Sequence, residues 1–407
     1  MLDNKKRDFT PFDMVKRPVN QNPLLMPIIW GAPYLLTRGN KLKIKKVNMK
    51  GLKPPFLVFA THQGFSDYYI APLAMFPYRA NYVSDMEGFA AFGDWLYRNI
   101  GCIGKRRYVA DISVMNNIKY CLKRKRNVVI FPESRHTNAG ITSKIPGNLG
   151  RLAKLFNVNV LVLSAHGSYL ANPFWDEERS RKAKMEATLE CIYTKEQLEN
   201  VTAKEIQDRI YSMLQYNEYE YQQKHHIMIK EKYRAEGLHK PLYICKNCGK
   251  PYKMTSEGIY LECKACGMGW ELKEEGYLQS KDGRVEIPEW YEWQRQLAID
   301  NFVKNPMREY KVKVEALPNE KGFIPLGNGR LVLNENEFIL SCDGEIRVFK
   351  HVNRESVQTE YNYRKKGMCI VLSDKDCCYY IYSMDDDFNP TELQFVGEYL
   401  YDEKYRR

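Results

Sequence analysis

The sequence predicts an α/β domain in which helices flank a sheet, followed by a small cysteine-containing module and a β-rich C-terminal region. Apolar runs of strand length alternate with helical patterns between residues 55 and 194, paired cysteines follow from residue 245, and short strands alternate with turns after residue 323. The 407 residues, 44% of them hydrophobic and 28% charged, are enough for two to four domains and exclude a disordered protein.

The α/β part is predicted from runs of β-branched and aromatic residues that read as buried strands, and from helical patterns between them. The expected strands are 56–60, 127–131, 158–164 and 185–194, and the expected helices are 67–76, 92–99, 111–124 and 149–156. Thr202 and Glu205 form a capping-box pattern, which predicts a long helix from there to about Lys232.

The N-terminal segment is basic and contains one apolar stretch, residues 24–36. Its 13 residues are fewer than the ~20 that span a bilayer, and Pro27 and Pro33 interrupt it. It is therefore either a buried core segment or a segment that lies in a membrane interface. Residues 1–7 are followed by polar residues and prolines, which predicts that they are not a signal peptide.

The C-terminal part begins with an expected hairpin at 277–287 around Asp282-Gly283 and an expected helix at 289–305. Short strands are expected at 330–333, 338–341, 345–350, 368–372 and 378–383, before a final helix at 391–401. Several strands closed by one C-terminal helix resemble a pleckstrin-homology or GRAM-like barrel.

The net charge of +12 favours an anionic partner, which is phosphate, an acidic membrane surface or nucleic acid. The charge is uneven: residues 1–56 hold twelve bases and three acids, and residues 374–403 hold nine acids and one base. The two ends are expected to face different partners, or each other. Seven of the 11 cysteines are scattered, which predicts free thiols in a reducing compartment.

His62 and Asp67 follow the expected strand 56–60 directly. A histidine on the loop that leaves a strand and an aspartate in the first helical turn can form a hydrogen-bonded dyad, in which the carboxylate orients the imidazole. Such an imidazole can take a proton from a hydroxyl nucleophile. The alternative interpretation is that Asp67 caps the helix and His62 is a turn residue.

Two further motifs are expected near this pair. Residues 101–107, GCIGKRR, end in a basic cluster suited to phosphate. Residues 131–135, FPESR, follow another expected strand, so Glu133 and Arg135 are predicted to emerge at the same edge of the sheet. The expected strand 158–164 then runs into a glycine-containing turn.

Together these segments resemble the glycerol-phosphate and lysophospholipid acyltransferase (PlsC-like) family over residues 55–170. His62 and Asp67 match its His-x4-Asp block, 101–107 its second block, and 131–135 its third. There are departures: Thr61 and Gly64 replace the usual Asn and Ser, Arg106 replaces an acid, and Ser134 alone separates Glu133 from Arg135. These changes leave the dyad intact and put the head-group contacts of the acceptor in doubt.

The resemblance implies that His62 is a general base, oriented by Asp67, for a hydroxyl that attacks an acyl thioester. Lys105, Arg107 and Arg135 are expected to hold the acceptor phosphate, and Glu133 to position its hydroxyl or glycerol part. The implied donor is acyl-CoA or acyl-carrier protein, and the implied acceptor is a lysophospholipid or glycerol phosphate, with 1-acyl-glycerol-3-phosphate preferred. The expected location is cytoplasmic, peripheral on the inner face of a membrane, where the basic N-terminus meets anionic lipid.

Cys245, Cys248, Cys263 and Cys266 form two CxxCG motifs with fourteen residues between them. Four thiolates at this spacing predict a zinc ribbon with a closed, structural Zn2+ site. Rubredoxin-like iron is the alternative.

The predicted organisation is a basic, amphipathic segment (1–54), an acyltransferase domain (55–237), a zinc ribbon (238–275), a hairpin and helix connector (276–310) and a β-rich domain with a C-terminal helix (311–407). Two other functions are open. A zinc-ribbon protein that binds nucleic acid would leave His62, Asp67 and the 131–135 motif without a role, so nucleic acid is not the expected partner. A non-catalytic lipid-binding scaffold would not need an intact dyad, so the presence of both His62 and Asp67 argues against this function.

Overall fold

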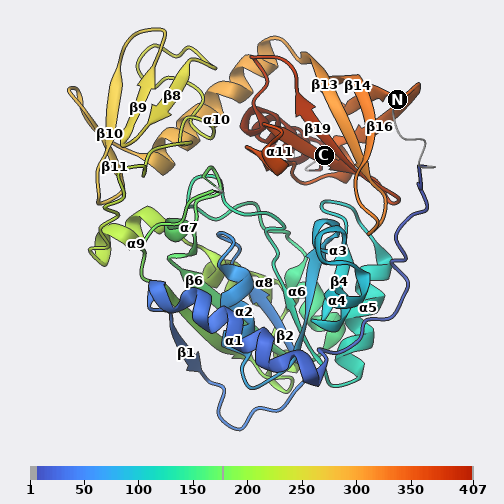
Figure 1. Cartoon of the computed structure of the whole chain (residues 1–407). Coiled ribbons are helices and arrows are strands. Elements are labelled where there is room, and N and C mark those ends of the chain that lie inside the picture. The colour runs from blue at the N-terminus through green and yellow to red at the C-terminus, as the bar shows by residue number, and fades with distance from the viewer. Residues whose placement is uncertain (1–6, 177, 406–407) are drawn as a thin grey trace.

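The computed structural model describes residues 7–176 and 178–405, which form an α/β region, a small β region and a C-terminal β region (Figure 1). The α/β region is built on one seven-stranded sheet with the order β1-β7-β6-β2-β5-β3-β4. Its strands are β1 (Lys43–Val47), β2 (Phe56–Ala60), β3 (Ala80–Asp85), β4 (Cys102–Lys105), β5 (Asn127–Ile130), β6 (Asn159–His166) and β7 (Glu186–Tyr193). Every neighbouring pair is parallel except β6 with β7.

The helices of this region confirm the predicted α/β class. They are α1 (Met26–Thr37), α2 (Asp67–Met75), α3 (Met86–Phe92), α4 (Asp94–Asn99), α5 (Ile112–Lys123), α6 (Leu149–Phe156), α7 (Ser168–Ala171), α8 (Ala203–Leu214) and α9 (Glu218–Lys224). All five residues of β2 are buried, as expected for a central parallel strand that is covered on both faces.

The predicted long helix from residue 202 to 232 is wrong in its length. The capping box of Thr202 and Glu205 is present, but α8 ends at Leu214 and a second helix starts at Glu218. Asn217 caps that second helix by accepting hydrogen bonds from the N–H groups of Tyr219 and Glu220. The break turns Tyr216 inward, where its hydroxyl reaches Glu133.

The apolar stretch 24–36 forms most of helix α1, which lies on the surface against α2 (Figure 1). The alternative of a buried core segment is wrong, because Leu24, Ile28, Leu35 and Leu36 are exposed, Leu35 by 66%. Across the described residues, none of the helices combines the length and the apolar character that crossing a bilayer requires.

The small β region is an antiparallel five-stranded sheet with the order β12-β11-β10-β9-β8. Its strands are β8 (Met254–Glu257), β9 (Tyr260–Cys263), β10 (Gly269–Leu272), β11 (Tyr277–Ser280) and β12 (Gly283–Glu286). The hairpin expected at 277–287 is β11–β12, and it extends the sheet that carries the cysteines. Helix α10 (Ile287–Lys304) then leads to the C-terminal region.

The C-terminal region is one antiparallel seven-stranded sheet with the order β16-β15-β14-β13-β19-β18-β17, closed by one helix. Its elements are β13 (Met307–Leu317), β14 (Ile324–Asn334), β15 (Glu337–Cys342), β16 (Glu345–Lys350), β17 (Gln358–Glu360), β18 (Cys369–Ser373), β19 (Cys378–Ser383) and α11 (Pro390–Tyr405). The sequence predicted β14, β15, β16, β18, β19 and the final helix, but not β13 or β17.

The C-terminal region packs directly on the α/β region, and the two share apolar cores. Tyr380 belongs to the same buried cluster as Leu57, and Phe395 belongs to the same cluster as Phe174. The segment that precedes α1 also ties them, since Phe12 donates its N–H to the carbonyl of Pro318 at 2.9 Å. A shared apolar core makes this a fixed interface rather than a flexible one.

Candidate active site

The candidate site lies where four neighbouring parallel strands, β2, β5, β3 and β4, reach their carboxyl ends. Parallel strands end at the same edge of a sheet, which is where ligands of open α/β sheets bind. His62 follows β2, Phe131 follows β5, Asp85 ends β3 and Lys105 ends β4. The sheet therefore brings together blocks that lie as much as 70 residues apart in the sequence.

His62 and Asp67 lie side by side, but the hydrogen bond predicted between them is not formed. Nδ1 of His62 lies 3.4 Å from Oδ2 of Asp67, and both side chains are buried. The same carboxylate oxygen accepts the backbone N–H groups of Gln63 and, at 3.0 Å, of Gly64. Asp67 thus holds the loop and faces the imidazole. The interpretation of Asp67 as the helix cap is wrong, because Ser66 occupies the cap position and the Asp67 carboxylate accepts N–H groups that precede the helix.

Burial controls the ionisation of the pair. Desolvation, followed by the positive charge of Arg107, lowers the pKa of His62 to about 3, and desolvation raises the pKa of Asp67 to about 6. The imidazole is therefore neutral around pH 7, and its low pKa makes it a weaker base than a solvated histidine.

Glu133 supports the histidine through the backbone. Its Oε1 accepts the N–H of His62 at 2.8 Å, and its Oε2 accepts the N–H of Ser143 at 2.7 Å and the hydroxyl of Tyr216 at 2.8 Å. Burial raises the pKa of this carboxyl to about 7. The contacts of Glu133 thus run to protein groups and fix the position of the His62 main chain.

Three aromatic side chains that were not among the predicted site residues enclose the imidazole of His62. The ring centroids of Phe131, His136 and Tyr68 lie 4.6, 4.3 and 5.8 Å from that of His62. His136 directly follows Arg135, so its position immediately after the third block was the available signal. These rings exclude water from the histidine and explain its low pKa.

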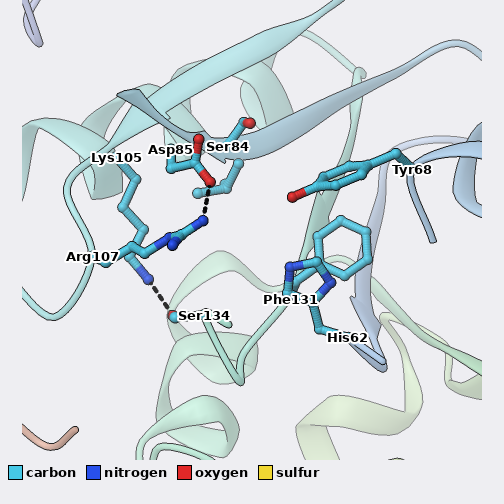
Figure 2. Close-up of a pocket in the computed structure, with 9 residues that line it drawn as sticks. His62, Tyr68, Ser84, Asp85, Lys105, Arg107, Phe131 and Ser134 are labelled. Atoms are coloured by element: carbon cyan, nitrogen blue, oxygen red, sulfur yellow. Dashed lines mark hydrogen bonds and ion pairs between the residues drawn. The ribbon is translucent and has the colours of Figure 1, made fainter. Parts of the chain in front are cut away.

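A cavity of about 40 Å³ opens beside His62 (Figure 2). The residues that line it are His62, Tyr68, Val83, Ser84, Asp85, Lys105, Arg107, Phe131 and Ser134. His62, Phe131 and Tyr68 form one side of the cavity. Lys105, Arg107 and Asp85 lie on the opposite side, as Figure 2 shows. The predicted residues Lys105 and Arg107 therefore share a cavity with the predicted base.

Arg135 lies outside this group of residues. Its side chain is buried under helix α11, where Nη1 donates to Oε1 of Gln394 at 2.9 Å and Nη2 lies 3.5 Å from Oε1 of Glu398. Among the described residues it does not line the cavity. No local pattern around residue 135 could have revealed partners more than 250 residues away.

The four cysteines of the CxxCG motifs form a cluster in the small β region. Their Sγ atoms all lie within 4.8 Å of one another, with 3.8 Å between Cys245 and Cys266 and between Cys248 and Cys263. Four sulfurs bound to one zinc ion at ~2.3 Å are about 3.8 Å apart at the corners of a tetrahedron. The cluster thus fits a metal ion held by four thiolates.

A family model covers the residues of the candidate site. Residues 40–166 match the family model described as Acyltransferase, a stretch that contains the dyad, the basic cluster and the 131–135 motif. This match confirms the predicted resemblance. Among solved structures, the chain is similar to the crystal structure of the 1-acyl-sn-glycerophosphate (LPA) acyltransferase PlsC from Thermotoga maritima, with 15% identity and a TM-score of 0.40, covering 47% of this chain and 76% of that one. No curated protein matches the chain.

Proposed function

We propose that this protein transfers an acyl group from a thioester to a hydroxyl of a lysophospholipid or glycerol-phosphate acceptor, with 1-acyl-glycerol-3-phosphate as the preferred acceptor. The observation that carries the proposal is the buried pair of His62 and Asp67 at 3.4 Å, beside a cavity that also contains Lys105 and Arg107. The Acyltransferase family match over residues 40–166 supports the same reaction class.

The reaction needs one proton transfer and one displacement. Asp67 faces Nδ1 of His62, which leaves Nε2 to take the proton of the acceptor hydroxyl. The oxygen then attacks the thioester carbonyl, the C–O bond forms, the C–S bond breaks, and the imidazolium returns its proton to the leaving thiolate. The thioester is already activated, so placing the two substrates supplies much of the rate.

Each remaining group of the site has a place in this scheme. Lys105 and Arg107, the cations that line the cavity, are proposed to hold the anionic part of the acceptor. Glu133 is proposed to position the acceptor indirectly, by fixing the main chain of His62. The donor is proposed to be acyl-CoA or an acyl-carrier protein. The four thiolates of the small β region would hold a Zn2+ ion that supplies structural stability and takes no part in the transfer.

The exposed face of α1 is proposed to contact the membrane that contains the acceptor. Leu24, Ile28, Leu35 and Leu36 are exposed on or beside it, and the exposed lysines at 41, 43 and 45 follow it directly. An apolar helix face next to several cations is typical of peripheral binding to anionic lipid. In this scheme the protein lies on the inner, cytoplasmic face of the membrane.

The test is thiol release from acyl-CoA in the presence of a panel of lysophospholipid acceptors, with wild-type protein and with His62→Ala. We expect kcat to fall by roughly 10²–10⁴-fold in the variant, the usual contribution of a general base, with the fold unchanged by circular dichroism. His225→Ala, a substitution of a histidine at the end of α9, is the matched control and should keep wild-type activity. A folded His62→Ala protein with full activity would contradict the role of His62 as the base. Wild-type protein that releases no thiol with any acceptor would contradict the proposed function and favour a binding protein or scaffold.

A further inference from the structure

A second cavity, apart from the one beside His62, lies where the small β region meets the α/β region. Trp175 and Arg181, which lie between α7 and β7 in the chain, line it together with Arg234 and Lys273, which follow α9. Its volume is about 30 Å³. A water-sized sphere takes up roughly 10–15 Å³ on this measure, so the cavity has room for a small group of a few atoms. None of the residues assigned to the transfer or to the metal lines it.

The described residues that line this cavity include cations and no carboxylate. The cations are Arg181, Arg234 and Lys273. Arg181 and Arg234 are buried, whereas the side chain of Lys273 is 33% exposed, so Lys273 marks the part of the cavity nearest to solvent. Buried cations require a compensating anion. The cavity beside His62 is different, because Asp85 lines it together with its cations.

The carboxylates near these cations are too few to neutralise them. Asp176 lies 3.0 Å from Nη2 of Arg181. Glu271 lies 2.6 Å from Nζ of Lys273 and 3.6 Å from Nη2 of Arg234. Within the parts of the chain that the structure describes, the three cations form no other salt bridge. Two carboxylates therefore face three cations, and one positive charge is left over beside the cavity.

Arg181 has a buried donor that is not used within the protein. Its Nη2 donates to Asp176 and, at 3.3 Å, to the carbonyl of Arg234, but its Nη1 is buried and bonds to no described atom. The guanidinium lies over the ring of Trp175, 4.8 Å from the centroid, which fixes its plane. Desolvation lowers the pKa of Arg181. Buried N–H donors are nearly always paired, so a fixed donor left free in the wall of a cavity is available to a ligand oxygen.

We propose that this cavity binds a phosphate group, free or as a monoester, between Arg181, Arg234 and Lys273. Phosphate supplies the negative charge that the three cations lack, and its oxygens match the N–H donors of a guanidinium. The two guanidinium groups form the buried end of the site, and Lys273 forms its entrance. Because Arg181 belongs to the α/β region and Lys273 to the small β region, the bound phosphate ties the two regions together. The site does not depend on the proposed transfer.

The test is hydrogen exchange of the full chain with increasing inorganic phosphate, and with chloride at equal ionic strength. Phosphate should slow exchange in residues 229–235 and 269–276, which contain Arg234 and Lys273, and the concentration dependence gives the Kd. Arg181→Gln should raise this Kd about tenfold or more, because it removes hydrogen bonds to a charged ligand. Lys273→Gln, at the exposed entrance, should raise the Kd roughly two- to fivefold.

The Lys273 variant tests the site even if Arg181→Gln does not fold. The side chain of Lys273 is partly exposed, and Glu271 remains beside Arg234 when Lys273 is replaced. Lys281→Gln is the matched control, because Lys281 is exposed in the turn between β11 and β12 of the same sheet. It should keep the wild-type Kd.

Two further measurements separate this site from the one beside His62 and identify the source of the phosphate. Lys105→Gln removes a cation from the other cavity, so protection of residues 229–235 and 269–276 should persist in that variant. Protection by inorganic phosphate assigns the site to the free anion, and protection by glycerol 3-phosphate alone assigns it to a phosphate ester.

Several results would overturn the proposal. They are protection by neither phosphate compound, equal protection by chloride, loss of protection in Lys105→Gln, and a wild-type Kd in the folded Arg181 and Lys273 variants. A Kd raised as much by Lys281→Gln as by Lys273→Gln would show general attraction by surface charge and would also overturn it.

Discussion

Asp67→Asn separates the two tasks of the aspartate. In the structure one carboxylate oxygen accepts the N–H groups of Gln63 and Gly64 and faces Nδ1 of His62 at 3.4 Å. An asparagine oxygen can occupy the same place and keep the loop, but a neutral amide does not stabilise the imidazolium. We therefore expect a folded protein whose kcat is lower by roughly 10²–10⁴-fold, which is about 2.7–5.4 kcal/mol of transition-state stabilisation.

The pH dependence gives the same prediction a second measurement. Burial raises the pKa of Asp67 to about 6 and lowers that of His62 to about 3, so acidification protonates the carboxylate first. The carboxylate form is present above its pKa, and wild-type kcat/KM should therefore decline as the pH falls through about 6. The imidazole stays neutral over that interval, so Asp67→Asn should retain its lower activity without this decline.

The assay is thiol release from acyl-CoA, followed from about pH 5 to pH 8 with a pH-independent thiol detector. Asp111→Asn is the matched control, because Asp111 caps helix α5 and asparagine caps equally well. It should reproduce the wild-type rate and profile. Wild-type kcat in Asp67→Asn, or an unchanged decline near pH 6 in that variant, would refute the dyad.

Two further predictions concern the metal and the membrane. Purified protein should contain one zinc ion per chain by elemental analysis, and Cys266→Ser should lose it and loosen residues 241–275 in hydrogen exchange; no bound metal in the wild type would contradict the site. Leu35→Glu together with Leu36→Glu should abolish sedimentation with anionic vesicles, and binding of the wild type should weaken with salt. Equal vesicle binding by the double variant would exclude α1 as the contact.

The fold could be predicted for those helices and strands whose bounds are marked by residues within the element itself. Strand β2 and helix α6 have the expected bounds, and the Thr202 cap starts α8 where the sequence indicated. Strand β3 was missed because ANYVSD has little apolar alternation and depends on pairing with β4 and β5. The end of α8 was missed because the hydrophobic periodicity of the sequence does not reveal the long-range hydrogen bond from the Tyr216 hydroxyl to Glu133.

The site residues that lie in short sequence motifs could be predicted. His62, Asp67, Lys105 and Arg107 carry residue types that fit proton transfer and anion binding, and the structure gathers them at one edge of the sheet. Their partners were not predictable in the same way. Asp85 ends a strand that the pattern did not reveal, and Glu360 approaches Arg107 only because the C-terminal region packs on this edge.

The packing of the C-terminal region pairs some of the acids of the stretch 374–403 with bases of the same chain. Glu398 lies between Arg135 and Arg295, Glu392 lies 3.5 Å from Arg308, and Asp402 lies 2.6 Å from Lys144. The lysines that follow α1, at 41, 43 and 45, are instead exposed. Acids that are paired internally contribute little field at a distance, whereas exposed cations attract anionic surfaces over roughly a Debye length. An anionic membrane is therefore expected to meet the α1 side of the molecule first.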